Sequence, residues 1–287
     1  MLHRRTTAAF LGFVGLISVA VSAFCLTSER FGWLNFYAWR VFAGKAHGGH
    51  FAKINGVSIY YEAYGAGRPV LVLHGGLGSH EDMRNQIRAL AESHLVIAPD
   101  SRGQGRSTDS DAPLTYSAMA DDMAQLLDCL QIDRADVVGW SDGGIIGLDL
   151  AMRYPERVRR LVAISANYDP TGIPQSPTTD GDVPRPPIRY SVFAETPSYW
   201  PVIYRKVTTM WQTQPNYSLD DLGQIKAPTL VMAGEFDIIK PEHTAKLAKA
   251  IPGSQETIVK GATHSVPTDR ADVVNEIIVN FLETIHH

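Results

Sequence analysis

The sequence predicts an α/β fold in which helices cover both faces of a mostly parallel sheet. Asn55-Gly56, between two short apolar segments at 51–54 and 57–64, is the strongest short signal for a β-hairpin. Six runs rich in Val, Ile and Leu follow, as expected for strands buried on both faces. Helical periodicity between these runs indicates repeated βα units, and such units build parallel sheets.

The elements can be assigned in order along the chain. The strands expected after the hairpin are 70–73, 95–98, 135–138, 160–164, 229–232 and 256–259, and the expected helices are 81–92, 116–130, 143–153, 241–250 and 271–285. In the second of these helices the large apolar residues recur at helical spacing, so we expect them to face the core. They are Met119, Met123, Leu126, Leu127 and Leu130.

One segment, 166–227, interrupts the alternation. It contains nine of the 17 prolines and many aromatic residues, and it has no clean strand period. A connection this long inside a compact domain is usually a functional lid or a disordered insert, and disordered segments are poor in aromatic residues. We therefore expect a cap or lid at 166–227, inserted into a domain that spans 51–287.

The charge of the chain is divided unevenly along its length. The 287 residues carry a net charge of -4, but residues 1–50 carry +4 and residues 51–287 carry -8. Residues 8–26 are uncharged, and 19 residues of helix span about 28 Å, close to the ~30 Å hydrocarbon core of a bilayer. Residues 1–50 are therefore predicted to form a transmembrane anchor or signal segment, followed by a linker that begins at Gly44.

The flanks of this apolar run predict its orientation. Arg4 and Arg5 precede it and are expected to stay cytoplasmic, while six aromatic residues between 31 and 42 resemble an interfacial stretch. The domain at 51–287 is then predicted to be membrane-anchored on the non-cytoplasmic side. If the segment is cleaved, the domain is secreted or periplasmic. The sequence does not indicate an oligomeric state.

Composition excludes several other classes of protein. Hydrophobic residues make up 45% of the chain, so it is not disordered, and the acidic balance argues against a nucleic-acid partner. The two cysteines cannot form a disulfide scaffold, and no Cys/His cluster has the spacing of zinc ligands. We expect no metal and no cofactor.

Residues 139–143 read Gly-Trp-Ser-Asp-Gly, a GxSxG pattern between a predicted strand and a predicted helix. In this context the chain turns so sharply that a side chain at either glycine would clash, and the turn presents the Ser141 hydroxyl at a helix N-terminus. Ser141 is therefore the candidate nucleophile.

A serine hydroxyl needs a base, which is in turn oriented by an acid. His264 and Asp237 each follow a predicted strand, so both are expected at the same carboxyl edge of the sheet as Ser141. Asp169 and Glu235 are the alternatives for the acid. Three further histidines lie at the edges of predicted helices or in a loop, so we expect them to be solvated; they are His80, His94 and His243.

A glycine-rich loop, His74-Gly75-Gly76, follows the first predicted parallel strand. Its glycines allow close backbone approach, so the N–H of Gly76 can face a developing oxyanion, with the N–H of Asp142 as the second donor. His74 is expected to brace this loop by hydrogen bonding rather than to act as a second base.

Together these motifs resemble the α/β-hydrolase superfamily. They are His74-Gly75-Gly76, Asp100 to Ser107, the elbow at 139–144, Gly234 to Asp237 and Gly261 to His264. The resemblance covers about 51–287 and implies an α/β-hydrolase fold with an inserted cap. The elbow is similar to that of valacyclovir-hydrolase-like esterases, and a serine at 141 differs from the aspartate nucleophile of the dehalogenase and epoxide-hydrolase branches.

The resemblance implies a serine hydrolase that cleaves small-molecule carboxylic esters through an acyl-enzyme. Lactone opening and cofactor-free perhydrolase or haloperoxidase chemistry on the same triad are alternatives, and a catalytically silent binding protein is a third. The Asp142 carboxylate either pairs with a cationic substrate group or is solvated or hydrogen-bonded locally. The sequence leaves the acyl and alcohol groups of the substrate open.

Overall fold

The structure is a computed structural model that describes residues 32–42, 44, 46–174 and 183–284. The apolar run at 8–26, predicted to be an anchor or signal segment, lies outside these residues. Among the helices that the structure does describe, none combines the length and the apolar character needed to cross a bilayer.

The chain divides into two compact units, 1–46 and 47–287. In the first unit, helix α2 (Gly32–Phe42) carries part of the aromatic stretch. Within this helix the rings of Phe36 and Trp39 stack with their centroids 5.7 Å apart, and the Arg40 guanidinium lies over the ring of Tyr37. The second unit contains the sheet and the predicted site.

Eight strands form one sheet in the order β1-β2-β4-β3-β5-β6-β7-β8. β2 pairs antiparallel with β4, and every pair from β4–β3 to β7–β8 is parallel. This confirms the predicted α/β class. The strands are β1 (Ala46–Ile54), β2 (Val57–Tyr64), β3 (Arg68–Leu73), β4 (His94–Pro99), β5 (Ala135–Trp140), β6 (Val158–Ile164), β7 (Thr229–Phe236) and β8 (Gln255–Thr263).

The predicted hairpin joins β1 and β2. Asn55 and Gly56 have φ angles of 47° and 79°, the two positive values that a type I′ turn requires. β1 begins at Ala46, five residues before the expected strand, so most of the stretch expected as a linker is part of the sheet. Its Gly and His residues hid this strand because they break the alternation of apolar and polar positions.

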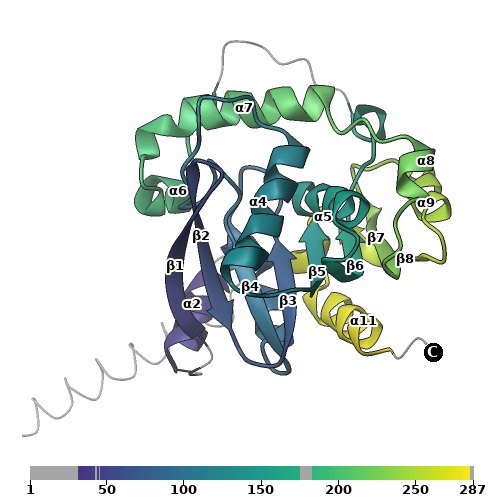
Figure 1. Cartoon of the computed structure of the whole chain (residues 1–287), viewed down its shortest axis with the longest axis horizontal. Coiled ribbons are helices and arrows are strands. Elements are labelled where there is room, and N and C mark those ends of the chain that lie inside the picture. The colour runs from purple at the N-terminus through teal and green to yellow at the C-terminus, as the bar shows by residue number, and fades with distance from the viewer. Residues whose placement is uncertain (1–31, 43, 45, 175–182, 285–287) are drawn as a thin grey trace, which may run out of the picture. The chain divides into compact units, whose positions relative to one another are not determined.

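Outside the segment between β6 and β7, the helices of the second unit lie where the apolar periodicity placed them, apart from the short helix at 266–269, which was not predicted. They are η2 (His80–Met83), α3 (Arg84–Leu90), α4 (Tyr116–Cys129), α5 (Asp142–Arg153), α9 (Pro241–Ala250), α10 (Val266–Asp269) and α11 (Ala271–Glu283). α4 packs against α5 in front of the sheet in Figure 1, and α3 packs against α11. The connection from β3 through α3 to β4 moves in one direction along the sheet, and the connection from β4 through α4 to β5 moves in the other. Right-handed crossovers therefore place α3 and α4 on opposite faces.

The segment between β6 and β7 is mainly helical. It contains η3 (Pro170–Gly172), α6 (Ile188–Phe193), η4 (Pro197–Tyr199), α7 (Trp200–Thr213) and α8 (Leu219–Leu222). Figure 1 shows α7 running across the carboxyl end of the parallel strands. Its inner face, formed by Ile203, Val207 and Met210, is buried in the same apolar cluster as the sheet. This segment therefore packs onto the domain through an amphipathic helix.

The strand order places the predicted site. The chain leaves β3 toward β4 on one side and leaves β5 toward β6 on the other, so the connections diverge between these two neighbouring strands. Ligands of open α/β sheets bind in the crevice outside the strand ends at such a point. The glycine-rich loop follows β3 and Ser141 follows β5, so both lie at this crevice.

A buried ion pair supports the loop that follows β4. Arg102 Nε and Nη2 each donate to the Asp122 carboxylate of α4 at 2.6 Å, and the Asn55 amide of the hairpin turn donates to the same group. We predict that Asp122→Ala lowers the free energy of unfolding by about 3–5 kcal/mol, because it leaves the guanidinium buried without an anion.

Urea denaturation measures this loss. Asp128→Ala is the control on the same helix, since Asp128 is half-exposed where it pairs with Arg157 and its removal should cost less than about 1 kcal/mol. Equal losses in the two variants would contradict a structural role for the buried pair.

Candidate active site

Ser141 lies between β5 and α5 with a strained backbone, at φ 54° and ψ -119°. A Cβ on Gly139 would come 2.1 Å from the carbonyl oxygen of Gly143, and one on Gly143 would come 2.4 Å from that of Leu73. Neither position can hold a side chain. Both glycines are therefore required for steric reasons, as the GxSxG pattern predicts.

Backbone hydrogen bonds hold this turn in place. The Ser141 N–H donates to the carbonyl oxygen of Ile164 in β6, and the Ser141 carbonyl accepts from the N–H groups of Gly144 and Ile145. The nucleophile candidate is thus fixed to the sheet on one side and to the first turn of α5 on the other.

The structure brings Ser141, His264 and Asp237 together from three strand ends. His264 Nε2 lies 3.0 Å from Ser141 Oγ, and His264 Nδ1 lies 2.7 Å from Asp237 Oδ1. Asp237 and Ser141 are thus hydrogen-bonded to opposite nitrogens of one imidazole. This is the geometry in which an acid orients a base and the base accepts the proton of a serine.

The Asp237 carboxylate is surrounded by donors. The Ser165 hydroxyl and the Gly234 N–H donate to Oδ2, and the Ile239 N–H donates to Oδ1. Burial alone would raise the pKa of Asp237, but the hydrogen bond and charge interaction with His264, helped by Ser165, outweigh it and lower the pKa. Asp237 therefore stays ionised beside His264.

The two alternative acids lie elsewhere. The Asp169 carboxylate caps η3 by accepting from the backbone N–H and hydroxyl of Thr171. Glu235 accepts from the N–H of Gly261 at the exposed end of β7. Asp237, which the sequence favoured over these two, is the carboxylate that is hydrogen-bonded to His264.

The glycine-rich loop after β3 lies beside the nucleophile. A Cβ on Gly75 would come 3.3 Å from that of Ser141, and one on Gly76 would come 2.4 Å from Asp142 Oδ2. The two predicted oxyanion donors, Gly76 and Asp142, are therefore neighbours. Leu77 follows with φ 58°, a strained value for a branched side chain, and the sequence pattern did not predict it.

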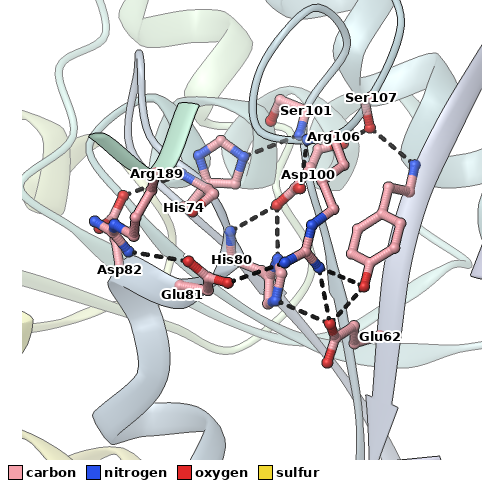
Figure 2. A network of polar contacts seen from close by, with 12 residues as sticks. Glu62, His74, His80, Glu81, Asp82, Asp100, Ser101, Arg106, Ser107 and Arg189 are labelled. Carbon is pink, nitrogen blue, oxygen red and sulfur yellow. Dashed lines mark hydrogen bonds and ion pairs between the residues drawn. The ribbon is translucent and has the colours of Figure 1, made fainter. Parts of the chain in front are cut away.

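His74 braces this loop, as its position predicted. Its Nε2 accepts from the Ser101 N–H at 2.9 Å, and its Nδ1 lies 2.7 Å from the Gly75 carbonyl oxygen, so Nδ1 carries the proton (Figure 2). Burial lowers the pKa of His74, although the Asp100 carboxylate opposes the shift. A neutral imidazole that is hydrogen-bonded at both nitrogens is a structural group and not a second base.

Asp142 is buried, with 3% of its surface exposed. Its carboxylate accepts hydrogen bonds from the Tyr116 hydroxyl at 2.9 Å and from the Trp211 indole at 2.8 and 3.0 Å. Burial raises the pKa of Asp142 to about 6, against these donors and the attraction of His264. The local hydrogen bonds foreseen as one role of this carboxylate are present, and pairing with a cationic substrate group stays a prediction.

A network of buried and partly buried charges joins η2 to the segment between β6 and β7 (Figure 2). His80 lies between Asp100, at 2.7 Å, and Glu62, at 3.6 Å. Burial alone would lower the pKa of His80, but these carboxylates outweigh it and raise it to about 10. On the other side of η2, Arg189 of α6 pairs with Glu81 and Asp82.

The expectation that the other histidines are solvated was wrong, because His80, His94 and His243 are all buried. Each has a tertiary partner that a single sequence does not reveal. His243 stacks on Tyr168 with ring centroids 3.9 Å apart, and His94 lies 3.2 Å from the Arg68 guanidinium.

Several residues at the site were not predicted. Ser165 had an available signal, since it directly follows β6 at the same edge as Asp237. Trp140 is in the elbow, and its indole donates to the His264 carbonyl oxygen at 2.8 Å. Tyr116 and Trp211 gave no local signal, because their contacts with Asp142 join distant parts of the chain. No group of three or more His, Cys, Asp or Glu side chains in the described ranges could hold a metal ion.

This fold and this site define the class of protein. A parallel sheet with a GxSxG turn after its central strand, and an acid and a histidine after later strands, is the architecture of an α/β hydrolase. Two family models match the chain, "alpha/beta hydrolase fold" over residues 68–199 and "TAP-like protein" over residues 199–286. The chain belongs to the α/β-hydrolase family, and it is an enzyme of the hydrolase class.

Named relatives and solved structures agree with this placement. The chain is 30% identical to the candidate carbamate hydrolase RutD of Azorhizobium caulinodans, over 82% of this chain and 97% of that protein. It is 30% identical to the human serine hydrolase BPHL, over 80% of this chain and 84% of that protein. The structure of Est816, titled as an N-acyl homoserine lactone degrading enzyme, is 28% identical with a TM-score of 0.67, covering 81% of this chain and all of that one.

The strain at Ser141 predicts an unusual order of stabilities. Glycine normally destabilises a protein relative to alanine by about 0.5–1 kcal/mol, but it adopts positive φ freely. We predict that Ser141→Gly is more stable than Ser141→Ala by about 1 kcal/mol, because only the glycine relieves the strain.

Thermal and urea unfolding of the two variants test this order. Both lack the hydroxyl, so the comparison isolates the backbone. An alanine variant equal to or more stable than the glycine variant would show that the turn is not strained.

Proposed function

We propose that the enzyme hydrolyses carboxylic esters through an acyl-enzyme, with Ser141 as nucleophile, His264 as base and Asp237 as acid. The observation that carries this proposal is the continuous hydrogen-bond chain from Asp237 Oδ1 through both nitrogens of His264 to Ser141 Oγ. Its two links, 2.7 and 3.0 Å, lie within the range that proton transfer requires.

In the first half-reaction Ser141 Oγ attacks the ester carbonyl carbon while His264 Nε2 takes the hydroxyl proton. The N–H groups of Gly76 and Asp142 donate to the oxygen that becomes negative in the tetrahedral intermediate. The bond to the alcohol oxygen then breaks, and His264 returns the proton to the departing alcohol. The product of this step is the acyl-enzyme on Ser141.

In the second half-reaction water attacks the acyl carbon and gives its proton to His264. The bond between the acyl carbon and Ser141 Oγ then breaks, His264 returns the proton to Oγ, and the carboxylic acid is released. In both halves the imidazolium of His264 is stabilised by Asp237, whose ionised state follows from its lowered pKa.

The same triad serves cyclic esters, so lactone opening is the second candidate. Two solved structures with this fold carry lactone-related titles, Est816 and the enol-lactonase from Burkholderia xenovorans. One relative is named a non-heme chloroperoxidase, which corresponds to peroxide in place of water in the second half-reaction. All three activities proceed through attack of Ser141 on an acyl carbon, and they differ in the substrate and in the second nucleophile.

We predict that triad variants lose ester hydrolysis in a characteristic order. Ser141→Ala and His264→Ala should each lower kcat by about 10⁶-fold, and Asp237→Asn by about 10⁴-fold. Glu235→Gln is the matched control, because Glu235 lies two residues from Asp237 and accepts from Gly261 instead of His264. Its kcat should stay within about threefold of the parent.

The assay is a series of p-nitrophenyl esters, run beside lactones and a peroxide-dependent halogenation assay. Stoichiometric labelling by a fluorophosphonate that requires both Ser141 and His264 supports the acyl-enzyme route. An unlabelled parent enzyme would contradict it. Faster turnover of lactones than of all open-chain esters would favour the second candidate.

We further propose that residues 8–26 anchor the enzyme in a membrane with its catalytic domain on the non-cytoplasmic side. The support is the sequence alone, namely 19 uncharged residues after Arg4 and Arg5. We predict that the full chain stays with membranes after alkaline carbonate extraction. Ile17→Arg with Val21→Arg should release it, because each arginine costs about 2.5–3.5 kcal/mol at the centre of a spanning helix.

Two outcomes separate this anchor from a cleaved signal. A soluble, N-terminally shortened product would show cleavage, and a full-length soluble chain would contradict membrane association. Ester hydrolysis by the extracted Arg variant checks that its catalytic domain is folded.

A further inference from the structure

Trp211 connects the segment above the sheet to the oxyanion hole. It lies on α7, and its indole N–H donates to both oxygens of the Asp142 carboxylate, at 2.8 and 3.0 Å. The backbone N–H of the same Asp142 is the second donor of the proposed oxyanion hole. One residue from the cap therefore holds the side chain of a residue whose backbone serves the reaction.

The same two side chains also form a wall behind Gly76, the first oxyanion donor. A Cβ at Gly76 would meet Asp142 Oδ2 at 2.4 Å and Trp211 Cζ2 at 2.5 Å. The backbone of Gly76 therefore packs directly against the carboxylate and the indole. Both proposed donors of the oxyanion hole are in contact with this pair.

We propose that Trp211 is a positioning residue for ester hydrolysis, which holds the Asp142 carboxylate against Gly76 and so couples the seating of α7 to the geometry of the oxyanion hole. This inference rests on the proposed function. It assigns Trp211 no contact with the reacting atoms, and its effect on the rate passes through Asp142 and Gly76.

Charge makes this arrangement important. A negative carboxylate next to an oxyanion hole opposes the negative charge that develops there, unless donors stabilise it. The groups that face Asp142 are Tyr116 from α4, Trp211 from α7 and His264 from the loop after β8, while Tyr217 lies near Tyr116. Removing the indole donor leaves the anion with the Tyr116 hydroxyl as its remaining side-chain donor.

The titration of Asp142 separates this role from simple packing. Its pKa is raised to about 6 by burial, so the carboxyl is neutral at pH 5 and ionised at pH 9. Loss of a hydrogen-bond donor destabilises the ionised carboxylate and raises the pKa of Asp142 further. The effect of removing Trp211 on kcat should therefore be small at pH 5 and large at pH 9, where the anion is present in both proteins.

Trp200 on the same helix is the matched control. Its indole N–H donates at 2.7 Å to the carbonyl oxygen of Pro184, so Trp200→Phe removes an equally short hydrogen bond that does not involve Asp142. Trp211→Phe and Trp200→Phe both keep an aromatic ring in place. The two variants differ in whether the lost indole donor was hydrogen-bonded to Asp142.

The experiment measures kcat and KM for one p-nitrophenyl ester between pH 5 and pH 9. Trp211→Phe should lower kcat by about tenfold at pH 9 and by less than about threefold at pH 5, with KM changed by less than about twofold. Trp200→Phe should match the parent within about twofold throughout. In an Asp142→Asn background the Trp211→Phe effect should be the same at every pH, because no charge remains to titrate.

A Trp211→Phe effect that is equal at all pH values, or equal to that of Trp200→Phe, would overturn the inference. Tyr116→Phe is the second variant, since it removes the other donor to the same carboxylate. Its loss of kcat should also increase from pH 5 to pH 9, which keeps the test available if Trp211→Phe folds poorly. Fluorophosphonate labelling of Ser141 in the parent is scored separately. Labelling without the pH signature rejects the role of Trp211 alone, and absence of labelling rejects the proposed function itself.

Discussion

The backbone of Ser141 is the constraint on which the site depends. A residue other than glycine in this conformation costs about 1–3 kcal/mol and persists where the surroundings hold it firmly. Here β5, the first turn of α5 and the carbonyl of Ile164 hold it, and the absence of side chains at Gly139 and Gly143 leaves room for it. The result is a hydroxyl that projects from the turn toward His264.

The segment between β6 and β7 meets the domain on both sides of the glycine-rich loop. On one side Arg189 of α6 pairs with Asp82, whose carboxylate lies 2.4 Å from where a Cβ of Gly78 would be. On the other side Trp211 of α7 holds Asp142 against Gly76. The loop proposed to stabilise the oxyanion is thus supported by both helices, so the seating of this segment bears directly on the reaction.

Two carboxylates interact with His264, and their surroundings shift their pKa values in opposite directions. Asp237 accepts from the imidazole, a hydroxyl and backbone N–H groups, and its pKa is lowered despite burial. Burial raises the pKa of Asp142 to about 6, although its neutral donors oppose the shift. Asp237 therefore keeps its negative charge near neutral pH, as a residue that orients His264 must. The charge of Asp142 instead depends on pH and on its hydrogen-bond donors.

The sequence by itself determined the α/β class and, outside the segment between β6 and β7, the succession of strands and most helices along the chain. It also singled out Ser141 and His264, because these features follow from local periodicity and from what comes directly after a strand. It favoured Asp237 as the acid without excluding Asp169 and Glu235, and it wrongly treated His80, His94 and His243 as solvated. Only the tertiary structure decided those cases and the contact of Trp211 with Asp142. The physical reason is that hydrogen-bond and charge partners are set by packing between elements far apart in the chain, and a single sequence carries no periodic trace of such pairs.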